Sequence, residues 1–260
     1  MRWYRFFGTA LVVALLACAL AGPTTPARAQ PQSWARVADL PPTATINDVF
    51  MLGVETAWAA GQDGEAGAIY RLSLSPGGWQ VSRDAVLAAP LRAIVALSDG
   101  DVWAAGDGGL FHRSAAGWQS VALPLEARLH ALQLLGDGSE GWASGSSAPD
   151  ASGQTRQVVL HFQDGRWQVD SAFDRAGEIR SLHFASSASG WAVGSDPNSR
   201  QGIWRYRKGR WSAEDDQVAC DVGCLRGLAV VRAIDDQTAW AAGSSIGLCA
   251  ICISTHDYLI

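Results

Sequence analysis

A tetrapeptide of the form Trp-Ala-Xaa-Gly recurs along the chain and constrains its fold more than any other feature. Its five copies are Trp58-Ala59-Ala60-Gly61, Trp103-Ala104-Ala105-Gly106, Trp142-Ala143-Ser144-Gly145, Trp191-Ala192-Val193-Gly194 and Trp240-Ala241-Ala242-Gly243. A second set of tryptophans precedes them: Trp34, Trp79, Trp118, Trp167 and Trp211. In four of the five pairs the two tryptophans are 24 residues apart, and in the last pair they are 29 apart. Such regular spacing indicates an internal repeat of about 46 residues.

Each repeat has the pattern of four short strands. Apolar runs rich in Val, Ile, Leu and Phe are typical of buried strands, and they occur at 46–52, 91–97, 129–135, 179–185 and 228–234. A polar turn then leads to the Trp-Ala-Xaa-Gly strand, whose small residues allow a neighbouring sheet to approach closely. We expect a third strand at 68–74, 109–113, 157–162, 203–207 and 248–254. A fourth is expected around each tryptophan of the second set.

Five such repeats predict an all-β protein, a five-bladed β-propeller of four-stranded antiparallel blades. The apolar run is the most continuously apolar strand of each repeat, so we expect it to be the innermost strand of its blade. The strand around Trp34 precedes all others, and no counterpart follows the last repeat. We therefore expect this N-terminal strand to pair with the strand at 248–254 and close the ring. A truncated larger propeller is the alternative.

Two segments give the repeat a family resemblance. They are Asp164-Gly165-Arg166-Trp167 and the stretch from Leu182-His183-Phe184-Ala185 to Gly190-Trp191-Ala192-Val193-Gly194. The repeat resembles that of the photosystem II assembly and stability factor-like propellers, which are related to the Asp-box propellers of sialidases and sortilin-type receptors. The resemblance implies an extracytoplasmic assembly scaffold without a cofactor. It speaks for fold more than for function, because that family is usually seven-bladed and nothing in this sequence indicates photosynthesis.

The first 29 residues have the pattern of a secretion signal. Arg2 and Arg5 precede an apolar stretch at 8–20, and Ala27-Arg28-Ala29 fits a cleavage site. Cleavage after Ala29 leaves 30–260 as one propeller domain, which we expect to be secreted or periplasmic. Leu15-Leu16-Ala17-Cys18 also fits a lipidation box, so a lipid anchor at Cys18 is the alternative. We expect no transmembrane span after the signal.

The charge of the chain argues against nucleic acid as a partner. The formal charge is -5, and removal of the three arginines of the acid-free signal brings it to -8. Binding to a phosphate backbone requires a basic surface instead.

No residue pattern indicates catalysis, a metal site or a cofactor. Gly243-Ser244-Ser245-Ile246-Gly247 matches the nucleophile elbow of hydrolases, but that motif has meaning only between a strand and a helix. We expect it in a hairpin of the fifth repeat instead. His112 and His161 each precede a tryptophan of the second set by six residues, so we interpret them as repeat positions rather than ligands. The tyrosines after the signal lie on or beside the third strands, away from a propeller's centre: Tyr70, Tyr206 and Tyr258.

Four cysteines follow the signal: Cys220, Cys224, Cys249 and Cys252. Four cysteines allow three pairings. Cys220 and Cys224 lie in the one segment that is five residues longer than its counterparts, which favours a disulfide between them after export.

One set of candidate binding residues remains. The residue after the first apolar position of each innermost strand is Asn47, Arg92, His130, Arg180 or Ala229, and Arg128 and Arg226 flank two of these positions. Because all innermost strands run in one direction, we expect these side chains around one mouth of the central channel. There they focus a positive potential on an acidic protein. The competing interpretation is that each arginine pairs with a loop carboxylate.

The leading hypothesis is therefore a secreted, non-enzymatic propeller that binds or scaffolds another protein. The alternative is a carbohydrate-binding protein or a sialidase-like glycoside hydrolase of the Asp-box type.

Overall fold

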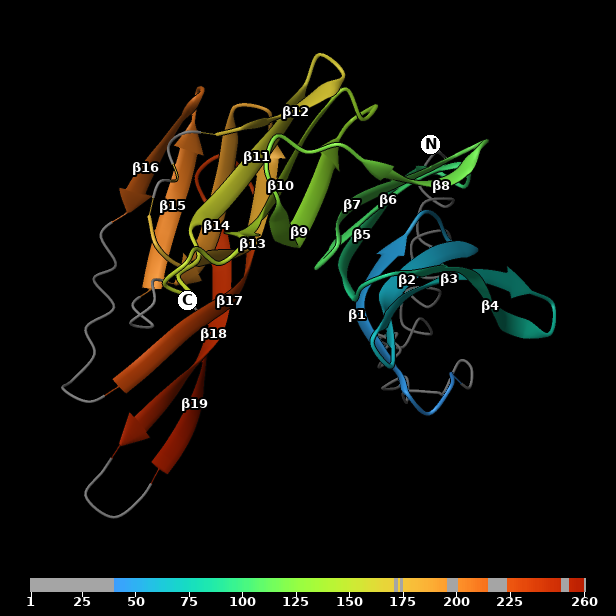
Figure 1. Cartoon of the computed structure of the whole chain (residues 1–260), viewed down its shortest axis with the longest axis horizontal. Coiled ribbons are helices and arrows are strands. Elements are labelled where there is room, and N and C mark those ends of the chain that lie inside the picture. The colour runs from blue at the N-terminus through green and yellow to red at the C-terminus, as the bar shows by residue number, and fades with distance from the viewer. Residues whose placement is uncertain are drawn as a thin grey trace, which may run out of the picture. The chain divides into compact units, whose positions relative to one another are not determined.

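The computed structural model describes residues 40–170, 173, 175–195, 201–214, 224–248 and 253–259, with side chains except at 201, 224–227, 244–248 and 253–259. These residues belong to one compact unit, Val37–Ile260. Within them the protein is all-β, with nineteen strands in five antiparallel sheets (Figure 1). The same ranges contain no helix long and apolar enough to traverse a bilayer. The predicted signal at 1–29, with Cys18, lies outside the described residues.

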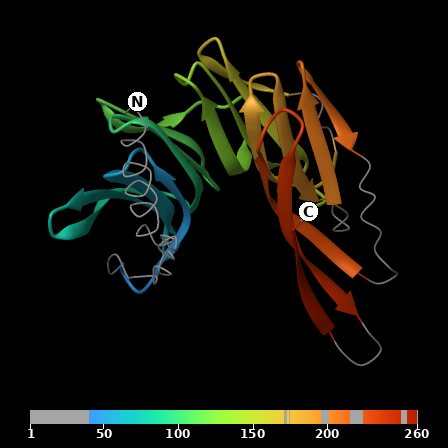
Figure 2. The ribbon, with the colours of Figure 1, turned by 180° about the vertical axis from the view of Figure 1, so that it is seen from behind.

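Each sheet is a meander of strands in chain order, which Figure 2 shows from behind, and we number the sheets blades 1 to 5. Blade 1 contains β1 (Ala44–Met51), β2 (Thr56–Asp63), β3 (Ala66–Ser75) and β4 (Gly78–Leu87); blade 2 contains β5 (Leu91–Ser98), β6 (Asp101–Gly106), β7 (Gly109–Ser114) and β8 (Gly117–Val121). Blade 3 contains β9 (Ala127–Leu135), β10 (Glu140–Ser147), β11 (Gln157–Gln163) and β12 (Arg166–Val169); blade 4 contains β13 (Glu178–Ser186), β14 (Ser189–Ser195), β15 (Gln201–Arg207) and β16 (Arg210–Glu214). Blade 5 contains β17 (Cys224–Ala233), β18 (Ala239–Leu248) and β19 (Ile253–Leu259).

Blades 1 to 4 confirm the predicted four-stranded unit, whereas blade 5 corrects it. β18 continues through Leu248 because β17 begins at Cys224 and offers it a partner along its whole length. The third strand of this repeat is therefore β19, and its prediction at 248–254 was wrong. For the same reason the Gly243–Gly247 motif lies inside β18 rather than in a hairpin. The strand expected around Trp34 lies outside the described residues, so its pairing with blade 5 stays a prediction.

A β-bulge interrupts the innermost strand of every blade near its start. The pairing of this strand with the Trp-Ala-Xaa-Gly strand skips one residue in each case, namely Asn47, Arg92, His130, Arg180 and Ala229. A bulge leaves its extra residue outside the ladder and re-aims that residue's side chain. The skipped residues are the five that the sequence placed at the channel mouth.

The repeat glycine is what permits this bulge. A Cβ atom on Gly61, Gly106, Gly145 or Gly194 would lie only 1.9 to 2.2 Å from a carbonyl oxygen at the start of the innermost strand. Such a separation is far below van der Waals contact, so only glycine fits. The small residues had been expected to admit a neighbouring sheet. This expectation was wrong for the glycine, because the backbone that approaches it belongs to its own blade.

The repeat tryptophans pack one blade against the next. Trp142 is fully buried, and its ring stacks on Phe184 of blade 4 with ring centroids 3.6 Å apart. Trp103 packs against Trp167 of blade 3 at 6.2 Å. Trp204 is also buried, and it packs against Phe173. Trp240 differs: it is 48% exposed.

A cationic or imidazole side chain on the third strand faces the repeat tryptophan in four blades. These residues are Arg71, His112, His161 and Arg205. The rings of His112 and His161 stack on Trp103 and Trp142 at 4.0 and 4.5 Å. Each also binds a carboxylate of its own blade; for His161 this is Glu140, at 2.9 Å. The two histidines are therefore repeat positions, as interpreted from the sequence.

Side chains on the innermost strands bind the backbone of the next blade. These strands are sheet edges, whose unpaired N–H groups need acceptors. The bonds are Ile94 N to Asp48 Oδ2 (2.9 Å), Phe184 N to Gln133 Oε1 (2.7 Å), Val231 N to Ser181 Oγ (3.1 Å) and Ala233 N to His183 Nδ1 (3.2 Å). Such contacts link blade 1 to 2, 3 to 4 and 4 to 5, and they hold the innermost strands beside one another.

We predict that Gly145→Ala destabilises the protein by about 2 to 5 kcal/mol, because its methyl group collides with the Arg128 carbonyl. Gly53→Ala is the matched control, since no atom lies within 4 Å of the Cβ added there. Chemical denaturation of both variants measures the difference. If the two glycines tolerate alanine equally well, the close approach does not constrain the bulge.

Candidate functional site

An open cavity of about 520 Å³, which we call the mouth, lies at the bulged ends of the innermost strands. It is lined by Asn47, Arg92, Arg128, His130, Ser146, Thr155, Glu178 and Arg180. Five of the six residues singled out in the sequence are therefore brought together. The sixth, Arg226, lies in β17 where side chains are not described.

The mouth opens onto a channel of about 570 Å³ that is lined by the innermost strands of all five blades. Asn47, Arg92, His130 and Arg180 line both spaces. Deeper in the channel, burial raises the pKa of Asp48, although two backbone N–H bonds and the charge of Arg232 oppose that shift. Four of the residues that the bulges re-aim thus line both the mouth and the channel.

Arg92 is held in place by Asp107, which follows the repeat glycine of blade 2. The Nε and Nη2 atoms of Arg92 donate to the two Asp107 carboxylate oxygens at 2.7 and 3.1 Å. This bidentate geometry is the strongest that an arginine forms with a carboxylate. It lowers the pKa of Asp107, which the charges of Arg128 and His130 lower further against partial burial.

Glu178 joins blades 3 and 4 at the mouth. Its Oε2 lies 3.3 Å from His130 Nε2, and its Oε1 accepts a hydrogen bond from Arg180 Nε at 2.6 Å. His130 first and Arg180 next lower the pKa of Glu178 from 4.5 to about 2, although partial burial opposes them. Glu178 is therefore ionised throughout the physiological range, and it orients the Arg180 guanidinium and the His130 imidazole.

Arg128 differs from the other two arginines of the mouth. It is exposed, and it makes no hydrogen bond or ion pair with any described residue; only its charge acts on Asp107. Three arginines thus face two carboxylates, which leaves the mouth with a net positive charge. The competing interpretation from the sequence, a pairing with a loop carboxylate, describes Arg92. Arg180 pairs instead with a carboxylate of strand β13, and Arg128 pairs with none among the described residues.

Sequence reasoning missed four residues of this arrangement: Asp107, Ser146, Thr155 and Glu178. Three of them carried a usable signal in the sequence. Asp107 and Ser146 each follow a repeat glycine directly. The strand register places this position beside the start of the innermost strand, as in the pairing of Ser146 with Arg128. Glu178 directly precedes the first apolar residue of an innermost strand, Ile179.

The other candidate chemistry falls elsewhere or outside the described residues. Tyr70 and Tyr206 are buried, and neither lines the mouth. Within the described ranges no group of three or more His, Cys, Asp or Glu side chains is placed to hold a metal ion. Cys220, Cys249 and Cys252 lie outside those ranges. Cys224 opens β17, where side chains are not described, so the predicted Cys220–Cys224 disulfide stays a prediction.

Comparison with known proteins supports the fold. No family model and no curated protein matches the chain. The crystal structure of AofleA from Arthrobotrys oligospora is similar, with a TM-score of 0.51 and 12% identity over 84% of this chain and 68% of that one. Hsv2 from Kluyvelomyces marxianus matches with a TM-score of 0.46 and 10% identity over 83% and 69%. At such identity the likeness to AofleA concerns the fold alone, and it agrees with a β-propeller-like arrangement of the blades.

We predict that the Glu178 contacts make stability depend on acid pH. Because the folded-state pKa is lowered, ionised Glu178 stabilises the protein above pH 4.5, and this contribution is lost as the pH falls from 4.5 to about 2. After allowance for solvent screening, Glu178→Gln lowers the free energy of unfolding by about 1 to 2 kcal/mol at pH 7, with no difference near pH 2.

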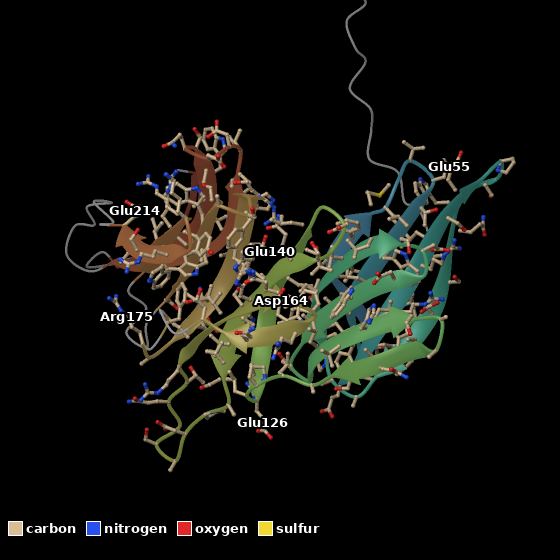
Figure 3. The ribbon with its side chains drawn as sticks, turned by 90° about the horizontal axis from the view of Figure 1, so that it is seen from above. Glu55, Glu126, Glu140, Asp164, Arg175 and Glu214 are labelled. Carbon is tan, nitrogen blue, oxygen red and sulfur yellow. The ribbon has the colours of Figure 1, made fainter. Side chains whose placement is uncertain are left out.

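Denaturation of both proteins across this range measures the difference. Glu55→Gln, at an exposed acid in the β1–β2 turn (Figure 3), is the control and leaves stability within about 0.5 kcal/mol. A pH-independent loss in Glu178→Gln contradicts the ionic account.

Proposed function

We propose that this chain is an exported, non-enzymatic β-propeller that binds another protein through the mouth. The observation that carries the proposal is Arg128, an exposed arginine without a partner among the described residues, in a cavity that also holds two oriented arginines. Arginine keeps its charge near neutrality and offers two parallel donors to a carboxylate. The bound group is therefore an acidic side chain or chain end of the partner.

The arrangement of donors fits such a group. Arg180 uses only Nε in its bond to Glu178, so neither terminal nitrogen has a bond to a described residue. Ser146 and Thr155 add hydroxyl groups to the same lining, and that of Thr155 donates to the Gly177 carbonyl oxygen. A carboxylate at Arg128 thus meets Arg180, which Glu178 already holds in place, and this reduces the ordering required on binding.

The architecture that we propose is a closed ring of five blades. Blade 5 has three strands within the described residues, which supports a fourth strand supplied by the segment around Trp34. A segment of a larger propeller is the alternative. The signal pattern at 1–29 supports export. The proposal includes a disulfide between Cys220 and Cys224, which would form after export. It also includes kinship to the photosystem II assembly factor-like propellers.

A carbohydrate ligand is the second candidate, because clustered arginines also suit the carboxylate of an acidic sugar. A glycoside hydrolase of the sialidase type additionally needs a nucleophile at the site. Among the described residues no tyrosine lines the mouth, which favours binding over hydrolysis. A glycan array with a fluorogenic glycoside panel distinguishes these candidates, and turnover that persists through purification contradicts the scaffold proposal.

We predict that Arg128→Ala weakens binding of a capped peptide with one aspartate about tenfold, which corresponds to about 1.4 kcal/mol. The aspartate peptide binds the parent protein more tightly than its asparagine counterpart, and this preference decreases as salt is added. Calorimetric titration measures both. Arg166→Ala removes an exposed arginine from the outer strand β12 and is the matched control. Equal losses in the two variants, or no preference for aspartate, contradict the proposal.

A further inference from the structure

A second cavity, of about 590 Å³, lies between blades 2 and 3, and we call it the blade 2–3 groove. Its lining comes from the turn after β6, the connection from β8 to β9 and the loop after β10. The residues are Asp107, Gly108, Gly109, Val121, Leu123, Leu125, Glu126, Ala127, Arg128, Ala148 and Pro149.

One wall of this groove is apolar and pre-formed. Val121, Leu123 and Leu125 are partly exposed, and they pack against the buried core that blades 2 and 3 share. Side chains that rest on a packed core lose little freedom when a ligand covers them. Gly109 has no side chain to fill the space, since a Cβ there would lie 3.8 Å from Leu123 Cδ1. The groove therefore offers room for an apolar side chain against an ordered surface.

The groove is continuous with the mouth through shared residues. Arg128 lines both cavities, and Asp107 lines the groove while it holds Arg92 in the mouth. A ligand whose anionic group binds Arg128 therefore lies next to the apolar wall.

The two cavities differ in the charges that they add around Arg128, which they share. The mouth adds Arg92 and Arg180, whereas the groove adds the exposed Glu126, whose side chain points away from the ribbon in Figure 3. Asp107 also lines the groove, but it is paired with Arg92. Glu126 repels an acidic residue from the groove, so the acid is directed to Arg128 and an uncharged residue to the apolar wall. This complementarity fits a peptide better than a sugar, which has no aliphatic side chain for that wall.

We propose that the mouth and the blade 2–3 groove form one site for a peptide segment that presents an acidic side chain next to a leucine-sized apolar one. The inference rests on the proposed function, to which it adds the chemistry of the partner. The acidic group binds the exposed Arg128, and the apolar side chain covers Leu123 and Leu125. The mouth and the groove can each bind their side chain weakly, because both contacts contribute to the affinity for one ligand.

Four capped peptides test this inference on the exported full chain. They carry Asp-Leu, Asp-Gly, Asn-Leu or Asn-Gly at the same place in a glycine-serine background. We expect Asp-Leu to bind about tenfold more tightly than Asp-Gly, and both to bind more tightly than their asparagine counterparts. The apolar advantage reflects roughly 1.5 kcal/mol from partial burial of one leucine.

Two variants locate the apolar contact. Ala148→Phe places a bulky ring at the exposed rim of the groove, and it abolishes the advantage of Asp-Leu over Asp-Gly while Asp-Gly binding is unchanged. Leu123→Ala reduces the same advantage. Ala116→Phe, on the exposed β7–β8 turn, is the control and leaves both affinities unchanged.

The outcomes separate the two proposals. If Asp-Leu and Asp-Gly bind equally well, the groove takes no part, and this inference is wrong while the proposed function stands. If no peptide shows a preference for aspartate, the proposed function fails and the inference fails with it. Binding of acidic glycans without peptide binding also overturns the inference. A chain that dimerises, and becomes monomeric only in Ala148→Phe, shows that the groove holds a second copy instead.

Discussion

The approach of a repeat glycine to a carbonyl oxygen of its own innermost strand governs the geometry of the mouth. At Gly61, Gly106, Gly145 and Gly194 no side chain fits between the two backbones. The innermost strand therefore lies close enough to carry one extra residue, and the bulge re-aims that residue's side chain. Because the same contact recurs along the chain, residues far apart in sequence, such as Arg92 and Arg180, line one cavity. The motif that identifies the repeat is also the motif that builds the candidate site.

Structural and functional demands fall on different positions of each blade. The repeat tryptophans and their apolar partners fill the space between blades, and Gln133 and Asp48 satisfy backbone groups of the adjacent innermost strand. The bulged residue varies as asparagine, arginine, histidine, arginine and alanine in the five blades. In blade 1 it still has a structural role, because Asn47 Nδ2 donates to the Leu91 carbonyl oxygen of blade 2, whereas Arg92 and Arg180 bind carboxylates at the mouth. Because the residue type at the bulged position can differ between blades, a repetitive scaffold can hold an asymmetric site. Polarity in the mouth is concentrated on blades 2 to 4, where Asp107 and Glu178 orient the cations.

Most of the fold and half of the site could be predicted from the sequence, for identifiable reasons. Spacing revealed the repeat, and apolar runs placed the innermost strands, so Arg92, His130 and Arg180 were recognised as equivalent positions. The carboxylates were missed because ion pairing depends on the register between strands, which periodicity does not show. Asp107 lies beside Arg92 only through the bulge. In blade 5 the apolar pattern did not reveal where β18 ends, because β17 extends to Cys224 and stabilises a longer partner.

Nitrogen-detected NMR of the arginine Nε–Hε groups tests most directly whether the mouth is a binding site for acidic groups. The protein is titrated with the capped aspartate peptide, and single substitutions assign Arg92, Arg128 and Arg180. The account predicts the largest shift at Arg128 and smaller shifts at Arg180, with Arg92 nearly unchanged because Asp107 already holds its Nε. Shifts confined to arginines of the outer strands, with Arg128 unaffected at saturation, contradict it.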